Sequence, residues 1–481
     1  MKMKMILPAL TEAKSPLFRP IKYALFPPLG LATLAAYLDE TDEVTIEDEH
    51  VGAVALDDEP DVVAIEAYIT SAKRAYELAD YYRLRGAHVC IGGLHPTSRP
   101  EEAARYADTV FLGPGEDTWP QFLRDFRAGR PKRMYRSTER TLVGAPRPRR
   151  DLIDRSRYLM PNSIVVSRGC PHNCDFCYKT SFFEGGRSFY TRAVDEALAE
   201  IDELPGRHLY FLDDNLVGNR QFASALFDGM RGMDRVWSAG GTVQAALDDE
   251  LMQRAAASGM RSLFIGFETL SAENLRGCGK SHNLHADYEQ AIARLRDLGV
   301  MVNASFVFGM DDDDPGVFDR TVEWAIGQGV ETATFHILTP YPGTPLHARI
   351  EQQGRILTED TDLYDTRHAV FQPARMSPQR LEEGYWRAYR DFYRWGSILR
   401  GASAKETLRA QLRHLTYTGA WKKAEPIWDA VIRARMLGFV VPLMEGVMSI
   451  GRRKREASAR ARTEKPTTAE TARVGTASLP R

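Results

Sequence analysis

Three cysteines of this chain stand close enough together to bind metal as a set. Cys170, Cys174 and Cys177 fall within eight residues, and the 481-residue chain has only two others, Cys90 and Cys278. Such an odd and sparse cysteine count does not fit a disulfide framework. Three thiolates on one short loop can instead bind three irons of a 4Fe–4S cubane and leave the fourth iron open, whereas a four-thiolate cluster is coordinatively closed.

A zinc site is the alternative interpretation of these cysteines. Structural zinc normally takes four protein ligands. His172 lies inside the same short loop, where a fourth ligand would have poor geometry, and Cys278 is remote in sequence. The spacing therefore favours an iron–sulfur cluster. Oxidants destroy exposed clusters, so we expect a reducing environment and a cytoplasmic protein.

The elements that must position this loop alternate between strand and helix. Six apolar strands separated by helical patterns are predicted between residues 163 and 344, at 164–167, 208–212, 236–239, 262–267, 300–308 and 332–338. The cysteine loop directly follows the first. Six such units predict a partial (β/α)6 TIM barrel with its chemistry at the carboxyl ends of the strands. A doubly wound open sheet is the competing interpretation.

A second parallel sheet is predicted at the front of the chain. In residues 1–135, short apolar strands alternate with helical patterns, which is typical of an α/β domain of the Rossmann or flavodoxin-like kind. Ligands of such sheets bind beyond the carboxyl ends of the strands. The basic, proline-containing segment 136–162 is interpreted as a linker to the barrel domain, 163–375.

The rest of the chain is predicted to be helical and then unstructured. Residues 376–450 form a helical C-terminal region, and the basic tail 451–481 is expected to be disordered. Segment 427–450 is interpreted as a domain-packing helix, with peripheral membrane contact as the alternative. No stretch reaches the ~18 uncharged apolar residues of a membrane span. Helical spacing favours a core role, rather than a substrate pocket, for Trp386, Tyr389, Phe392, Tyr393 and Trp395.

The cysteine spacing resembles the signature of a known superfamily. Cys-x3-Cys-x-aromatic-Cys after a first strand is similar to the pattern of radical S-adenosylmethionine (SAM) enzymes. The resemblance implies that Cys170, Cys174 and Cys177 hold a 4Fe–4S cluster whose open iron binds the methionine moiety of SAM. It also implies that an electron from the cluster cleaves SAM to a 5′-deoxyadenosyl radical. Phe176 takes the aromatic position, which in the superfamily packs near the adenine, and simple loop packing is its alternative role.

Two further strand ends resemble SAM-binding motifs of the same superfamily. The run Asp213-Asp214-Asn215 resembles the polar motif that receives the methionine ammonium group, and helix capping is its alternative role. Gly266 and Glu268 resemble the motif that contacts the ribose, because a carboxylate suits two hydroxyl donors. A structural salt bridge is the alternative for Glu268. Lys280 would balance the carboxylate charge.

The front domain resembles the cobalamin-binding domain of cobalamin-dependent radical SAM enzymes. The resemblance rests on segments 27–38, 92–97 and 113–116. Glycines there let the backbone approach a ligand closely. The hydroxyl groups of Thr70 and Ser71 either bind the nucleotide tail of cobalamin or cap a helix. The residues that the resemblance assigns to cobalamin are Thr70, Ser71, Gly92, Gly93 and His95.

A segment of the front domain nearly matches a cobalt-binding motif but departs from it at one position. Residues 48–53 nearly match Asp-x-His-x-x-Gly, in which the histidine ligates cobalt, but Ala53 stands in the glycine position. We therefore expect His50 to be a surface histidine and not a cobalt ligand.

Together the resemblances imply a cobalamin-dependent radical SAM enzyme. The leading hypothesis is methylation of an unactivated carbon, with phosphorus as the alternative acceptor, in a small-molecule, lipid or natural-product substrate. The alternatives are a radical cyclase that uses cobalamin without methyl transfer and a non-catalytic Fe–S protein. We expect a monomer served by an external reductant such as flavodoxin or ferredoxin. The net charge of −2 argues against a general nucleic-acid binder.

Overall fold

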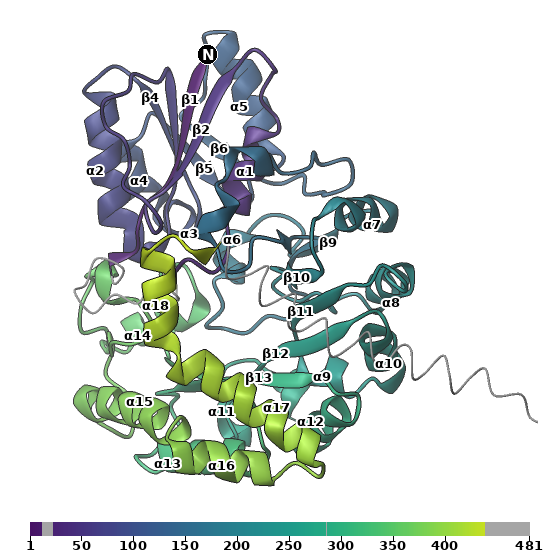
Figure 1. The fold of residues 1–481 in the computed structure, drawn as a ribbon. Helices are drawn as coiled ribbons and strands as arrows, with labels where there is room; N and C mark the ends of the chain where they lie inside the picture. The colour runs from purple at the N-terminus through teal and green to yellow at the C-terminus, as the bar shows by residue number, and fades with distance from the viewer. Residues whose placement is uncertain (12–22, 285, 438–481) are drawn as a thin grey trace, which may run out of the picture.

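The computed structural model describes residues 1–11, 23–284 and 286–437 (Figure 1). A front domain lies above a larger barrel-like domain, and helices near the end of the described chain run back toward the front domain. The predicted tail 451–481 and most of segment 427–450 lie outside the described residues.

The front domain is built on a six-stranded sheet in which every neighbouring pair is parallel. Its order is β2-β1-β3-β4-β5-β6, which includes the flavodoxin-like order 2-1-3-4-5. The strand order reverses between β1 and β3, the place where such sheets bind ligands. The strands are β1 (Lys2–Leu7), β2 (Glu43–Asp48), β3 (Val62–Glu66), β4 (His88–Gly92), β5 (Thr109–Leu112) and β6 (Met134–Arg136).

Helices cover both faces of this sheet, which explains the nearly continuous apolar strands. On one face Val63, Ile65 and Val89 belong to a buried cluster with residues of α2 and α4. On the other face Met3 and Met5 pack with residues of α1 and α5. The helices are α1 (Leu29–Ala35), α2 (Ala72–Arg83), α3 (Leu94–Ser98), α4 (Pro100–Tyr106) and α5 (Thr118–Arg127).

The second domain is built on a sheet whose strands follow one another in chain order, β7-β10-β11-β12-β13-β14, all parallel. A doubly wound sheet would reverse its order partway, so the predicted partial barrel is confirmed. The strands are β7 (Ser163–Ile164), β10 (His208–Phe211), β11 (Val236–Gly241), β12 (Met260–Glu268), β13 (Met301–Phe308) and β14 (Thr332–Ile337).

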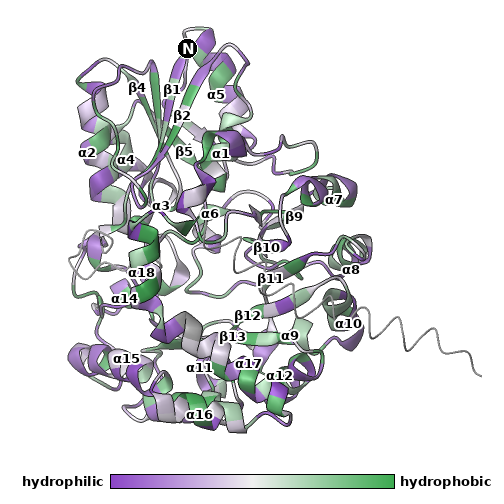
Figure 2. Cartoon of the chain, viewed as in Figure 1, coloured by the Kyte–Doolittle hydropathy of each residue, from purple (hydrophilic) through white to green (hydrophobic). Residues whose placement is uncertain are grey.

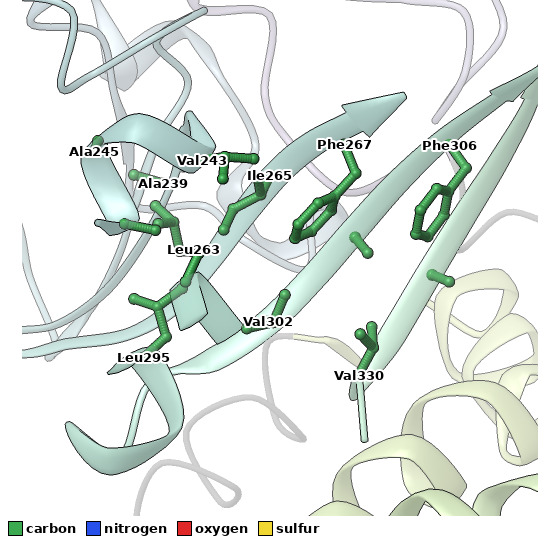
Figure 3. Packing of buried hydrophobic residues seen from close by; sticks show 14 of the residues in the cluster. Ala239, Val243, Ala245, Leu263, Ile265, Phe267, Leu295, Val302, Phe306 and Val330 are labelled. Carbon is green, nitrogen blue, oxygen red and sulfur yellow. The ribbon is translucent and has the colours of Figure 1, made fainter. Parts of the chain in front are cut away.

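The two faces of the barrel sheet differ in chemistry. Figure 3 shows Leu263, Ile265 and Phe267 of β12 on the face that packs with Val302 and Phe306 of β13. Helices cover this face: α7 (Val194–Glu203), α8 (Arg220–Gly229), α9 (Val243–Ala246), α10 (Asp249–Ala257), α12 (Tyr288–Asp297) and α13 (Val317–Gly327). Because side chains alternate along a strand, the other face carries small and polar residues, among them Ser262, Asn303, Ser305, Thr334 and His336.

The C-terminal helices close the barrel domain. They are α14 (Pro345–Gln352), α15 (Pro378–Phe392), α16 (Trp395–Ser403), α17 (Leu408–Thr418) and α18 (Glu425–Arg433). Tyr389 and Tyr393 are hydrogen-bonded to strand β14, and Phe392 is buried, so their predicted core role is confirmed. The prediction is wrong for Trp386 and Trp395, which are 52% and 57% exposed.

Green, apolar segments lie mainly along the strands and the inner helix faces, and purple segments lie on the outer helix faces (Figure 2). Among the described residues, no helix combines the length and the hydropathy needed to cross a membrane. Within α18, Trp428, Val431 and Ile432 pack with Leu25 and Leu159. The described start of segment 427–450 therefore packs against the rest of the protein.

Candidate functional site: a cysteine loop facing a front-domain pocket

The cysteine loop leaves the barrel through a short antiparallel ribbon, β8 (Ser167–Gly169) with β9 (Phe189–Thr191). The predicted first strand 164–167 is thus divided between β7 and β8. Gly169 has φ +75°, and a Cβ there would lie 2.0 Å from the Ser188 carbonyl oxygen. The Cys170 amide donates to that same oxygen at 3.0 Å. A glycine is therefore required for the loop to turn away from the ribbon.

The loop brings its three thiols together, free of disulfides. Burial, together with the nearby Cys174, Asp214 and Cys170, raises the pKa of Cys177 to about 12. Asn215 Nδ2 donates to Cys170 Sγ at 3.5 Å, and Lys179 Nζ donates to the Cys170 carbonyl at 2.8 Å. Clustered thiols with an N–H donor and a nearby cation suit an iron–sulfur cluster, whose binding would deprotonate them.

Within the described ranges, no three His, Cys, Asp or Glu side chains converge as they would on a single metal ion. A cubane instead takes its thiolates at three separate corners. His172 stacks on His282, with ring centroids 3.7 Å apart.

The polar run that ends β10 organises the loop. Asp213 accepts hydrogen bonds from the Val166 amide and from the amide and hydroxyl of Ser167. Asp214 accepts from the Gly169 amide at 2.8 Å and from the Tyr178 hydroxyl. These two aspartates are thus occupied by the ribbon and the loop rather than by a helix end.

Asn215 has the side chain with capacity left for a ligand. It is 2% exposed, and its Oδ1 has no protein partner while its Nδ2 faces Cys170. A buried carbonyl oxygen without a partner is costly, so a bound donor is expected there. The ammonium group of SAM would supply such a donor, and the residues present fit that ligand.

Glu268 and Lys280 form a close pair at the end of β12. Their Oε1 and Nζ atoms lie 2.5 Å apart, and both side chains are nearly buried. Glu268 has φ +65° and follows an irregularity in the β12–β13 register. A Cβ on Gly266 would lie 2.3 Å from Glu268 Oε1, so glycine makes room for the pair. Backbone strain of this kind clusters at functional sites.

In the front domain a pocket opens at the carboxyl ends of β3, β4 and β5, beside the switch point. Its lining residues include Leu34, Ile65, Glu66, Cys90, Gly92, Gly93, Phe111, Gly113, Gly115, Glu116 and Trp119. Gly93 has φ +113°, and a Cβ there would lie 2.7 Å from the Ala67 carbonyl oxygen. Apolar walls and a glycine-rich rim fit a flat, partly apolar group such as the cobalamin tail.

The other residues assigned to cobalamin lie outside this pocket's lining. Thr70 and Ser71 are buried in a short 3-10 turn, Ile69–Ser71, where Ser71 Oγ accepts from the Tyr68 amide at 3.0 Å. His95 is fully buried, and its Nε2 lies 3.1 Å from Glu102. Their role in cobalamin binding stays a prediction.

His50 is not a surface histidine, and that expectation is wrong. Its side chain is 7% exposed, and its Nδ1 lies 2.8 Å from Asp48 Oδ1. The Leu10 amide donates to Nε2 at 3.2 Å. The Leu10 donor and the Asp48 acceptor together assign the proton to Nδ1, so neither ring nitrogen keeps a free lone pair.

The sequence did not single out four residues near the two sites, of which Glu66 and Arg168 line the front-domain pocket. Glu66 ends β3 and Tyr68 follows that strand, whereas Arg168 precedes the cysteine loop and Tyr178 follows it. Tyr68 OH donates to Glu66 Oε1 at 3.4 Å. Burial raises the pKa of Tyr178, with a contribution from the nearby Tyr68. Tyr178 and Arg168 adjoin the cysteine motif in sequence, which is the one signal that could have marked them.

Comparisons with known proteins agree with this arrangement. Residues 164–325 match the Radical SAM superfamily, and residues 23–123 match the B12 binding domain. Bacteriochlorophyllide d C-12(1)-methyltransferase of Chlorobaculum tepidum is 29% identical over 79% of this chain and 85% of its own length. The C-8(2)-methyltransferase of the same organism is 27% identical over 77% and 86%.

Two solved structures share the fold. The radical SAM methyltransferase TsrM from Kitasatospora setae, with cobalamin and a 4Fe–4S cluster bound, gives a TM-score of 0.61 at 16% identity, over 82% of this chain and 88% of its own. The cobalamin-dependent radical SAM enzyme OxsB, with aqua-cobalamin bound, gives 0.63 at 14% identity, over 90% and 72%.

The chain therefore carries an N-terminal B12-binding domain followed by a radical SAM domain. Its cofactors are a 4Fe–4S cluster, SAM and cobalamin.

Proposed function

We propose that this protein is a cobalamin-dependent radical SAM methyltransferase that transfers a methyl group to an unactivated carbon of a small-molecule substrate. The observation that carries the proposal is that the two sites are adjacent. Arg168, two residues before Cys170, also lines the front-domain pocket. The methyltransferase names of its relatives support the reaction class.

When bound, the three cofactors supply a carbon-centred radical and a transferable methyl group. The residues of the chain have to position these cofactors relative to one another and to the substrate. Cys170, Cys174 and Cys177 would bind the cluster, and Asn215 Oδ1 would accept from the SAM ammonium group. Glu268 would accept from the SAM ribose while Lys280 neutralises its charge. The polar face of the barrel sheet would offer hydrogen-bond donors and acceptors to a substrate. His336 of β14 lies on that face.

The experiment is anaerobic reconstitution followed by mass spectrometry with methyl-labelled SAM. Candidate substrates are a bacteriochlorophyllide and a hopanoid, which are the compounds named for relatives. Label in the product together with 5′-deoxyadenosine supports the proposal. An altered product without label would indicate the cyclase alternative, and no cleavage of SAM under reducing conditions would indicate a non-catalytic Fe–S protein.

The cluster is tested separately. The Cys170, Cys174 and Cys177 triple alanine variant should lose its iron, whereas Cys278→Ala, at a buried cysteine outside the loop, should keep it. Tightly bound zinc in the wild type after anaerobic reconstitution would contradict the assignment.

A further inference from the structure

The two ends of the cysteine loop reach into the cobalamin pocket of the front domain. Arg168 stands two residues before Cys170, and Phe182 ends α6 (Lys179–Phe182), which begins two residues after Cys177. Both side chains line the front-domain pocket together with Gly113 and Glu116. The segment that carries the cluster thiols therefore also forms one wall of the other cofactor's pocket.

Arg168 is tied to this wall by charge. Its Nη2 and Nε lie 2.8 and 3.0 Å from Glu116 Oε1, and the Glu116 side chain is 7% exposed. The charge of Glu116 raises the pKa of Arg168, so the guanidinium stays charged. Glu66, which also lines the pocket, is a second carboxylate close enough to interact with Arg168. Burial raises the pKa of Glu66, and the positive charge of Arg168 opposes that shift. The Arg168 side chain is 31% exposed, but the Glu116 carboxylate is buried, so removing Arg168 would leave a buried charge without its partner, which is costly.

Phe182 is tied to the wall by backbone packing. Gly113 has φ +83°, and a Cβ there would lie 3.0 Å from the Phe182 carbonyl oxygen. In the linker, the buried Arg140 donates to the carbonyls of Phe183 at 2.6 Å and Glu184 at 2.8 Å. These bonds fix the turn that follows α6. A shift of the pocket wall must consequently move both ends of the cysteine loop.

We propose that Arg168 and Phe182 are positioning residues that couple the two cofactor sites, so that cobalamin binding and cluster assembly strengthen each other. The inference rests on the proposed function, because it requires both cofactors. Cobalamin in the pocket would order Arg168 and Phe182. The cysteine loop would then lose less conformational entropy when it binds the cluster. Such coupling is reciprocal for binding free energies, so it can be measured from either side.

The test is an absorbance titration of the full-length chain with hydroxocobalamin, in a cluster-free and a cluster-reconstituted form. The wild type should bind at least about fivefold more tightly with the cluster present, the lower bound of typical site–site coupling. Arg168→Gln and Phe182→Ala should bring the ratio of the two Kd values close to one. Arg168→Lys should restore part of it, because the charge opposite Glu116 remains.

A matched control is offered by a second ion pair between the two domains. Arg136 Nη1 lies 3.3 Å from Glu184 Oε2, but both side chains are at least half exposed and neither lines the pocket. Arg136→Gln should leave the ratio unchanged. If Arg168→Gln does not fold, Glu116→Gln removes the same pair from the front domain and should give the same loss of coupling.

Three outcomes overturn the inference. Equal Kd values for the two wild-type forms would show that the sites are independent. A ratio that survives in Glu116→Gln, Arg168→Gln and Phe182→Ala would place the coupling elsewhere. A chain that binds no cobalamin at all would remove the inference and the proposed function together, whereas the first two outcomes leave the proposed function standing.

Discussion

Replacing Gly169 by alanine should damage the cluster site more than its backbone conformation alone predicts. The αL conformation costs alanine roughly 1–2 kcal/mol relative to glycine. In addition the new Cβ would lie 2.0 Å from the Ser188 oxygen, so the ribbon must open. Opening it breaks the 3.0 Å bond from the Cys170 amide, a further loss of about 1 kcal/mol. The expected total is about 2–3 kcal/mol, together with a displaced Cys170.

Gly185 provides a matched control for this substitution. Its φ of +74° is close to the +75° of Gly169, but a Cβ there would meet nothing within 4 Å. Gly185→Ala should therefore lose only the conformational part, about 1–2 kcal/mol. Since 1 kcal/mol shifts Tm by roughly 2–4 °C in domains of this size, thermal unfolding resolves the two variants.

The assay combines Tm with the iron content of anaerobically reconstituted protein. Gly169→Ala should lower both, and Gly185→Ala should lower Tm slightly while it keeps its iron. Equal Tm losses with equal iron contents in the two variants would refute the reasoning, because they would show that the contact with Ser188 does not position Cys170.

Further predictions concern single residues. His50→Gln should leave the cobalamin spectrum unchanged, because both ring nitrogens have protein partners; nitrogen splitting in the electron paramagnetic resonance of cob(II)alamin that vanishes in the variant would contradict this. Glu268→Ala should weaken SAM binding in calorimetry by about 1–3 kcal/mol and keep its iron; unchanged affinity would leave Glu268 only its ion pair. Burial raises the pKa of Asp313 from 3.8 to about 6, so the folded state binds more protons and stability should fall as pH rises through that window. In urea unfolding, the free energy of unfolding should depend less steeply on pH in Asp313→Asn than in the wild type. An unchanged slope would contradict the raised pKa of Asp313.

The parts of the site that could be predicted from sequence are local ones. The three cysteines lie on one loop after the first barrel strand, and Asp213 and Glu268 could be placed at the carboxyl ends of apolar strands. Both domains have parallel sheets because strands and helices alternate along the chain. In the barrel domain the predicted partial barrel implies the observed order, which equals the chain order, whereas only the structure excludes the doubly wound alternative.

The parts that escaped prediction depend on contacts between distant segments. The broken cobalt-binding motif predicts a surface His50, yet the Leu10 amide and the Tyr23 ring, from segments at least 27 residues away, contact it. Trp386 and Tyr389 share one helix, and composition does not show which of them faces the barrel. Arg168 and Glu116 are 52 residues apart, so no local pattern could pair them.

This last pair changes how the division of labour between the domains is understood. Read from the sequence, cluster and cobalamin belong to separate domains, so deletion of residues 1–130 would remove only cobalamin. In the structure that deletion would also remove Glu116 and Gly113, which leaves Arg168 without its carboxylate and Phe182 without the backbone it packs on. Because Arg168 and Phe182 would lose the contacts that fix the two ends of the cysteine loop, we expect the deletion to lower iron content as well. The carboxyl edges of the two sheets thus meet at the cysteine loop, and the coupling that we propose between the cofactor sites runs through this contact.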